Sequence, residues 1–360
     1  MERVYNFSAG PSQMPEEVLL KAQKDLLSYK ETGTSVMEMS HRSPAFQEII
    51  DGAKESLKSL MNVPDDYDIL FLQGGASLQF SMIPMNLLKR GEKCAYAVTG
   101  NFAGKAAEEA MRWGDVKIVA SSKEDNFTYI PEITSDMVPQ DAKYLHITGN
   151  NTIFGTTYYQ TPKAGSVPLV ADWSSAILGK EVNVTDYELI YAGAQKNMGP
   201  AGLTVVIIKK DLLNNEIDNL VPTMLQYKVH ADKGSMYNTP PCWSIYMASL
   251  MFDWVKEQGG VKEMERRNCE KAKLLYDYID NSSLFNNNVR EKDRSIMNAT
   301  FVLPSQEQTG AFVKFAASKG LVNVKGHKLV GGCRASIYNG MPLSGVEKLI
   351  AVMKEFETNV

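Results

Sequence analysis

Lys196 is an isolated charge in an otherwise uncharged stretch of the sequence. It is the only charged residue between Glu188 and Lys209, in LIYAGAQKNMGPAGLTVVII. Strand-like apolar runs flank it and small residues surround it, so a flat group can approach its amine. Partial desolvation lowers the pKa of such an amine and favours its neutral, nucleophilic form. From these residues alone, a loop lysine without a chemical role is the open alternative.

Asp172, 24 residues upstream, is isolated in the same way between Lys163 and Lys180. It follows a short apolar run, at the end of a predicted strand where open α/β sheets place ligands. A buried aspartate needs a cationic or hydrogen-bonding partner, and a protonated pyridine nitrogen would supply one. A carboxylate that caps the following turn is the alternative.

The segment FLQGGASLQ has a glycine pair, Gly74 and Gly75, between a predicted strand and a predicted helix. The free N–H groups and positive dipole end at the start of a helix suit a phosphate. An ordinary turn is the alternative reading. A phosphate cradle, a carboxylate for a ring nitrogen and an isolated lysine are together the parts that a pyridoxal phosphate site requires.

The elements that must position these residues follow an alternating pattern. Short apolar runs alternate with helical stretches from residue 68 onward, which indicates a mostly parallel, helix-flanked sheet. The predicted strands are 69–72, 95–98, 116–120, 144–148, 168–171, 189–191 and 203–208. The predicted helices of this part are 16–30, 44–62, 77–89, 103–113 and 244–257. We therefore expect an α/β fold with a large domain over 16–257.

After residue 258 the pattern changes to a smaller α+β domain, which also takes in residues 1–15. Its predicted elements are helices 259–281, 306–319 and 344–357 with strands 297–303, 321–324 and 333–338. The whole chain of 360 residues is 44% hydrophobic and 22% charged, with a net charge of −4. This composition argues against a nucleic-acid or anionic-membrane partner.

The cysteines and histidines show no spacing typical of a metal site or a disulfide framework, so we expect no metal. The first residues lack the apolar core of a signal peptide, and no run of about 18 apolar residues occurs. We expect a cytoplasmic protein.

At these residues the sequence resembles the class V aminotransferases of pyridoxal phosphate fold type I, most closely the members that act on phosphoserine. The resemblance runs nearly end to end and is highly specific. It is carried by NFSAGPS (6–12), SHRS (40–43), GGAS (74–77), GNFAGKA (100–106), NNTIFGT (150–156), ADWSSAIL (171–178), AQKNMGPAGL (194–203), NTPP (238–241), GH (326–327) and CRAS (333–336).

The resemblance assigns the cofactor contacts. It implies that Lys196 carries pyridoxal 5'-phosphate as a Schiff base and shuttles a proton, and that Asp172 pairs with the pyridinium nitrogen. Phe102 would stack on the ring, with core packing as its alternative, and Thr152 would bind near the phenolic oxygen, with turn capping as its alternative. The implied phosphate contacts are Ala76, Ser77 and Gln195, with Asn238 and Thr239 from a second subunit.

A homodimer with composite sites follows from that last assignment, and the alternative for the NTPP motif is an ordinary proline turn. Arg334 is the only charge between Lys328 and Glu347, which suits a clamp for the substrate α-carboxylate. A buried structural ion pair is its alternative.

The resemblance further assigns the substrate phosphate, or the side-chain carboxylate of glutamate, to His41, Arg42 and His327. The two histidines rest chiefly on the resemblance, because a lone histidine is more often structural. Some family members carry arginine where this chain has Ser77, so the phosphate grip must come from Arg42 and the histidines, with help from Lys328.

The implied reaction is the ping-pong transfer of an amino group from L-glutamate to 3-phosphohydroxypyruvate, giving O-phospho-L-serine and 2-oxoglutarate in serine biosynthesis. A related four-carbon substrate of pyridoxine biosynthesis is a further expectation. The alternatives within the family are a serine- or alanine-glyoxylate aminotransferase and a cysteine desulfurase, for which Cys333 is the nearest nucleophile. A non-catalytic protein of this fold would lack the lysine or the aspartate, and both are present.

Overall fold

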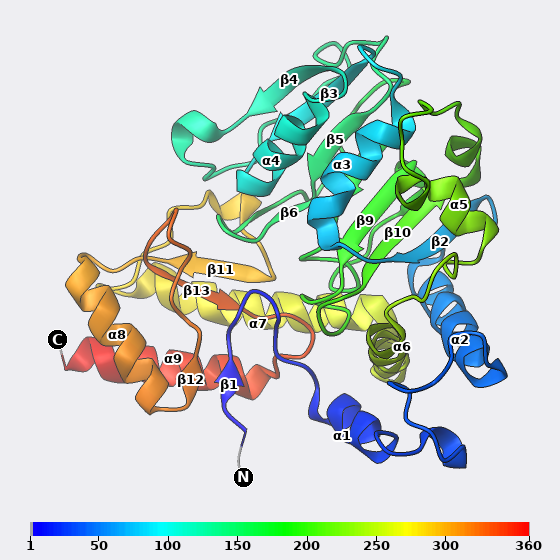
Figure 1. The fold of residues 1–360 in the computed structure, drawn as a ribbon. Helices are drawn as coiled ribbons and strands as arrows, with labels where there is room; N and C mark the ends of the chain where they lie inside the picture. Colours follow the sequence, from blue (N-terminus) through cyan, green and yellow to red (C-terminus); the bar gives the residue numbers. More distant parts are fainter. Residues whose placement is uncertain (1–2, 360) are drawn as a thin grey trace.

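The structure is a computed structural model that describes residues 3–359. The predicted small domain begins at residue 1 and ends at residue 360, so residues 1, 2 and 360 of that prediction lie outside the described residues. The chain forms one seven-stranded sheet flanked by helices and, beside it, a group of small sheets and helices from the C-terminal third (Figure 1).

The seven predicted strands form a single sheet in the order β2-β10-β9-β8-β5-β3-β4. Their bounds are β2 Tyr67–Leu72, β3 Lys93–Val98, β4 Asp115–Ser121, β5 Leu145–Thr148, β8 Leu169–Asp172, β9 Leu189–Gly193 and β10 Thr204–Lys209. Strand β10 runs antiparallel to both of its neighbours, and the other neighbouring pairs are parallel. The prediction of a mostly parallel, helix-flanked sheet is confirmed.

The apolar runs are continuous because both faces of the sheet are buried. Alternate residues of a strand point to opposite faces. In β2, Ile69 and Phe71 belong to the core shared with α2 and α6, whereas Leu70 and Leu72 belong to the core shared with α3 and α4. The helices of this part are α1 Glu16–Lys24, α2 Pro44–Met61, α3 Gly75–Leu87, α4 Asn101–Ala110, α5 Tyr227–Asp232 and α6 Cys242–Glu257.

Helix α2 shows how the local sequence sets an element's ends. The Ser43 hydroxyl accepts a hydrogen bond from the Phe46 N–H at 3.3 Å, and Pro44 takes the first helical position. The helix ends at Asn62, whose φ of 49° is left-handed.

The C-terminal group contains α7 Gly260–Asn281, α8 Gln306–Ser318 and α9 Leu343–Thr358. Strand β11 (Asn298–Phe301) pairs with β13 (Cys333–Ser336) in an antiparallel ribbon. Strand β1 (Tyr5–Asn6) pairs in parallel with β12 (Leu321–Val322), so the N-terminal segment lies beside the C-terminal elements (Figure 1).

Two local predictions were wrong. The helix predicted over 16–30 ends at Lys24, because Asp25 and Tyr29 are both anchored to Tyr246 of α6. The Tyr246 hydroxyl donates to the Asp25 carboxylate at 2.7 Å, and the Tyr29 and Tyr246 rings meet edge to face at 5.8 Å. The second error is one of omission, because the hairpin of β6 (Asn150–Asn151) and β7 (Thr156–Thr157), strand β1 and helix α5 were not predicted.

Short 3-10 helices complete the chain. They are η1 Tyr29–Glu31, η2 Lys123–Asp125, η3 Val184–Asp186, η4 Lys210–Asn214, η5 Thr223–Leu225 and η6 Glu291–Asp293. Among the described residues, no helix has the length and apolar character needed to cross a membrane.

Candidate active site

Lys196 lies in the turn between β9 and β10 and contacts two of the other predicted site residues. Its Nζ donates a hydrogen bond to Thr152 Oγ1 at 2.6 Å and lies 5.2 Å from the centre of the Phe102 ring. Thr152 belongs to the β6–β7 hairpin, and Phe102 lies in the first turn of α4. The fold therefore brings together three residues that are far apart in the sequence.

The surroundings of Lys196 disfavour the charged form of its amine. Burial lowers the pKa of Lys196 to about 8, Asp172 opposes this shift, and Arg334 adds to it. Both charged groups are thus close enough to act on the amine. With this pKa about a tenth of the amine is neutral at pH 7, far more than for an ordinary lysine, and the neutral form is the nucleophile.

This lowered pKa gives a testable pH dependence. Only the neutral amine can attack an aldehyde, and the folded pKa lies near 8 rather than 10.5. We expect the rate at which cofactor-free protein captures pyridoxal phosphate to rise about tenfold per pH unit below pH 8 and to level off above it. Stopped-flow absorbance across a pH series measures this rate, and a rate still rising steeply at pH 10 contradicts the prediction.

Asp172 ends strand β8 in the middle of the sheet and is 5% exposed. One carboxylate oxygen, Oδ1, accepts a hydrogen bond from the Ser174 N–H at 2.8 Å. Burial raises the pKa of Asp172, and the nearby charge of Lys196 and the hydrogen bonds from Ser174 partly counter that shift. A further cationic partner stabilises a buried carboxylate, and a protonated ring nitrogen is such a partner.

The glycine turn joins β2 to α3 in left-handed backbone. Gly74 and Gly75 have φ values of 87° and 65°, and a Cβ on Gly74 would lie 2.5 Å from the side chain of Leu78. The backbone can turn this tightly because these positions are glycine. Ala76 and Ser77 follow in the first helical turn, where N–H groups have no intrahelical acceptor.

Gln195 lies next to Lys196 and is half-buried, with its side chain folded over Gly193. No hydrogen bond within the described chain joins its amide to the glycine turn. Its predicted contact with the cofactor phosphate stays a prediction.

Arg334 lies in β13 and points toward the β6–β7 hairpin. Its Nη1 donates to the Thr152 carbonyl at 3.3 Å, while its Nε is buried without a hydrogen-bond partner in residues 3–359. No carboxylate of the described chain forms a salt bridge with it, so the structural ion pair is absent there. Burial lowers the pKa of Arg334, which agrees with a guanidinium that lacks a counter-charge.

Three cationic side chains, Arg334 among them, lie near His327. Burial lowers the pKa of His327, and Arg334, Lys328 and Lys105 lower it further through their charges. Lys105 was not predicted as a site residue. Its signal was its place in GNFAGKA, three residues after Phe102 and about one turn along α4.

The substrate-binding roles of His41 and Arg42 stay predictions. Both residues lie before α2, and no hydrogen bond or ion pair of the described residues joins them to Lys196. Arg42 is exposed, and His41 Nε2 is buried without a partner within residues 3–359.

Asn238 and Thr239 are exposed in the loop before α6. The Thr239 carbonyl accepts a hydrogen bond from Gln73 Nε2 at 3.3 Å, but neither side chain is hydrogen-bonded within the described chain. These two side chains are therefore free to meet a second chain.

The N-terminal segment contributes contacts that the residue types alone did not identify. The Ser12 hydroxyl donates to the Lys196 carbonyl, and the Ser12 N–H donates to the Gln195 carbonyl at 3.0 Å. A Cβ added to Gly10 would lie 3.2 Å from Lys196 Cγ. The only sequence signal for these contacts was the motif NFSAGPS.

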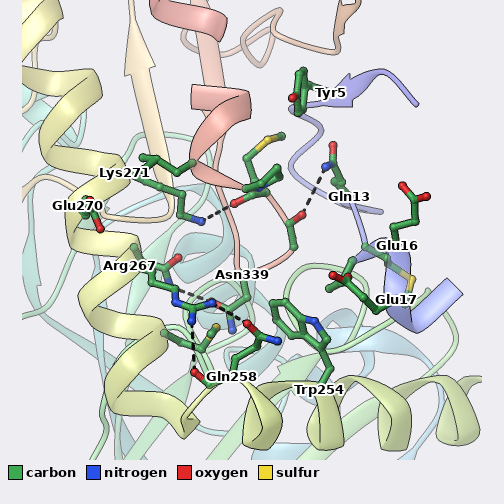
Figure 2. Close-up of a pocket in the computed structure, with 18 of the residues that line it drawn as sticks. Tyr5, Gln13, Glu16, Glu17, Trp254, Gln258, Arg267, Glu270, Lys271 and Asn339 are labelled. Atoms are coloured by element: carbon green, nitrogen blue, oxygen red, sulfur yellow. Dashed lines mark hydrogen bonds between the residues drawn. The ribbon is translucent and has the colours of Figure 1, made fainter. Parts of the chain in front are cut away.

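A separate cavity of about 660 Å³ lies between the N-terminal segment, the end of α6, α7 and residues 339–343 (Figure 2). Lys271 lines it, but its Nζ donates to the carbonyls of Ile337, Tyr338 and Met341 at 2.8–2.9 Å. All three amine protons are used, so this lysine is structural. Neither Lys196 nor Asp172 lines the cavity, which is distinct from the candidate site.

The residues present fit pyridoxal phosphate. A lysine amine of lowered pKa lies beside an aromatic ring, with a buried carboxylate close enough to act on it. The glycine turn has open space for an anion, because a Cβ on Gly75 would meet nothing within 4 Å. The buried Nε of Arg334 has no hydrogen-bond partner in the described chain, so it can donate to an anionic ligand.

Comparisons with known proteins agree with this geometry. The family described as "Aminotransferase class-V" matches residues 4–349. The chain is 53% identical over 357 residues to a phosphoserine aminotransferase of Bacillus cereus, covering 99% of both chains.

Two solved structures are similar throughout. One is titled "Radiation damage of the Schiff base in phosphoserine aminotransferase"; it is 46% identical, with a TM-score of 0.97 and full coverage of both chains. The other is the phosphoserine aminotransferase of Trichomonas vaginalis with bound PLP. It is 37% identical with a TM-score of 0.92, covering 98% of this chain and 100% of that one.

Proposed function

Because the chain belongs to the class V aminotransferase family, we propose that it catalyses the phosphoserine aminotransferase reaction. It transfers an amino group between L-glutamate and 3-phosphohydroxypyruvate, giving O-phospho-L-serine and 2-oxoglutarate, and it uses pyridoxal 5'-phosphate. The observation that carries this function is the half-buried amine of Lys196 between Thr152 and Phe102, in a chain similar over its full length to phosphoserine aminotransferases.

When bound, pyridoxal phosphate supplies an electron sink for the charge that develops at the substrate Cα. The protein's own residues do the rest. Lys196 holds the cofactor and then moves a proton at the substrate Cα, which its lowered pKa supports. Asp172 keeps the ring nitrogen protonated, since its buried charge needs a cationic partner.

The elements around Lys196 supply the other residues that would hold the cofactor. Phe102 would cover one face of the ring, and Thr152 would bind beside the phenolic oxygen. The first turn of α3, with Ala76 and Ser77, would bind the phosphate together with Gln195. These roles are supported by the open left-handed turn at Gly74–Gly75 and by the contacts of Thr152 and Phe102 with the Lys196 amine.

Arg334 binds the substrate α-carboxylate. An arginine that is buried without a counter-charge is well suited to a planar, bidentate anion. We expect Arg334→Ala to raise the KM for L-glutamate and for O-phospho-L-serine together, by roughly 100-fold. Steady-state kinetics with both substrates measure this. A rise for only one of them contradicts a role on the carboxylate that the two share.

The distal phosphate, or the second carboxylate of glutamate, binds the cations near Arg334. Lys328 and Lys105 lie close enough to His327 that, with burial and Arg334, they lower the pKa of its imidazole. This group offsets the absence of an arginine at Ser77. His41 and Arg42 join it from a second subunit in this proposal, because the described chain does not connect them to Lys196.

The functional unit is a homodimer with composite sites, in which Asn238 and Thr239 bind the cofactor phosphate of the partner. We expect a solution mass near twice 40.0 kDa. Mixing inactive Lys196→Ala chains with impaired Asn238→Ala chains should restore activity, because a mixed dimer has one site with both native residues. Mixed dimers without restored activity would contradict composite sites.

A cysteine desulfurase is the less suitable alternative. Cys333 is 1% exposed in β13, and burial raises the pKa of its thiol to about 12. Such a thiol is neither mobile nor ionised. Activity on the four-carbon substrate of pyridoxine biosynthesis stays a prediction.

The function is tested by incubating the holoenzyme with L-glutamate and 3-phosphohydroxypyruvate and measuring 2-oxoglutarate and O-phospho-L-serine. Equal amounts of the two products, with parallel double-reciprocal lines, are expected. Faster turnover with glyoxylate as amino acceptor, or sulfide release from cysteine, would favour the other members of the family.

A further inference from the structure

The ribbon that carries Arg334 has one polar face. In the β11–β13 ladder Asn298 lies opposite Ser336, and Thr300 lies opposite Arg334. Because side chains alternate along a strand, these four residues share a face. That face packs on the β6–β7 hairpin, where Thr300 Oγ1 donates to the Phe154 carbonyl and Arg334 Nη1 donates to the Thr152 carbonyl.

Asn298, the first residue of β11, is fully buried on this face. Its Nδ2 donates to Ser336 Oγ at 3.0 Å and to the Tyr338 hydroxyl at 3.1 Å, and its Oδ1 accepts from Asn150 Nδ2 at 2.8 Å. Both amide protons and the carbonyl are used. A flipped amide would set two donors against each other, so the network allows one orientation.

The partners of Asn298 lead to the other site segments. Asn150 precedes Thr152 by two residues, and its Nδ2 also donates to Ser175 Oγ at 2.7 Å. Ser175 follows Asp172 by three residues. The Tyr338 hydroxyl donates to the Ala9 carbonyl at 2.8 Å, in the segment that packs on Lys196.

The guanidinium of Arg334 is held by few contacts of its own. The one hydrogen bond of its side chain in the described chain, to the Thr152 carbonyl, is 3.3 Å long. The location of its guanidinium therefore depends on how its strand is docked. Four of the side chains in the docking contact, Asn298, Asn150, Ser175 and Ser336, are at most 3% exposed and hydrogen-bonded to one another.

We infer that Asn298 is a positioning residue for substrate binding, which acts through Arg334 by fixing the β11–β13 ribbon to the segments that carry Thr152 and Asp172. This inference rests on the proposed function, in which Arg334 binds the substrate carboxylate. An apolar side chain of similar size would fill the space but remove one hydrogen bond from each of three buried partners, leaving the Ser336 hydroxyl with none in the described chain and the ribbon free to shift.

The test is Asn298→Leu in the holoenzyme. We expect the KM for L-glutamate and for O-phospho-L-serine to rise together by about tenfold, while kcat changes by less than about threefold. The absorbance of the bound cofactor and its affinity should stay as in the wild type, because Asn298 acts on the carboxylate side of the site.

A double-mutant cycle separates positioning from general stability. In an Arg334→Ala background, Asn298→Leu should cost little further kcat/KM, because the group it positions is already gone. Losses that multiply in the double variant overturn the inference. Phe301→Leu is the matched control: Phe301 is buried on the opposite face of β11, and its substitution should lower thermal stability without raising KM.

Ser336→Ala is the second variant if Asn298→Leu does not fold. It removes one acceptor of Asn298, two residues from Arg334, and should raise both KM values in the same direction by a smaller factor. Unchanged KM values overturn the inference. A wild-type protein that converts neither substrate overturns the proposed function and this inference together, whereas an active wild type with multiplying losses overturns the inference alone.

Discussion

Lys196→Ala should leave a folded protein whose turnover falls by at least about 10⁴-fold. The substitution removes both the attachment of the cofactor and the amine that moves a proton at the substrate Cα. Its half-buried Nζ has one hydrogen-bond partner among the described residues, Thr152, so the structural loss is small. The measurement is 2-oxoglutarate formation at saturating substrate, with circular dichroism to check the fold.

Lys209→Ala provides the matched control for that variant. Lys209 ends β10, close in sequence to Lys196, but contacts neither Thr152 nor Phe102 through any hydrogen bond or cation–π contact of the described chain. It should turn over substrate at the wild-type rate. Residual activity of Lys196→Ala within about tenfold of wild type would mean that another group carries out the proton transfer.

Asp172→Asn has the second large expected effect, a loss of roughly 10³-fold in kcat. The amide preserves the shape of the side chain but cannot offer a negative charge to the ring nitrogen. Since that charge acts in the transition state, kcat should fall more than KM rises. Steady-state kinetics give both values, and a change confined to KM contradicts the proposed role.

The stability of the Asp172→Asn protein distinguishes function from folding. Burial raises the pKa of Asp172, so the folded state disfavours its charged form. This cost is fully present above the raised pKa and disappears as the pH falls below the ordinary value. At neutral pH, therefore, cofactor-free Asp172→Asn should unfold at the same or a higher temperature than wild type while its activity is lost. A clearly lower melting temperature would attribute the loss to misfolding.

The features that could be predicted from the sequence are those that show in a short stretch of residues, such as an apolar run or an isolated charge. Most strands of the central sheet contain a continuous apolar run, because both faces of the sheet are buried there, whereas the edge strand β4 contains Lys117 and is partly exposed. Lys196 and Asp172 were identified for a related reason, since a single charge in an apolar stretch is visible without knowing what it contacts. Their proximity in the fold follows from neighbouring strands β8 and β9.

The parts that were missed depend on contacts between distant segments. The amide network of Asn298 and Asn150 joins residues 148 positions apart, and neither asparagine differs in sequence from an ordinary surface residue. The hairpin β6–β7 has only two residues per strand, too few to show a period. Asn238 and Thr239, by contrast, were predicted from the motif NTPP; neither side chain has a hydrogen-bond partner in the described chain, so their role stays a prediction.

The most direct test of the central claim is to find which amine carries the cofactor. Reducing the holoenzyme with borohydride makes that linkage permanent, and peptide mass spectrometry then locates the modified lysine. The account predicts the added mass on Lys196 alone, with none when the Lys196→Ala protein is treated in the same way. A modification found instead on another buried lysine, such as Lys180 or Lys271, would contradict it.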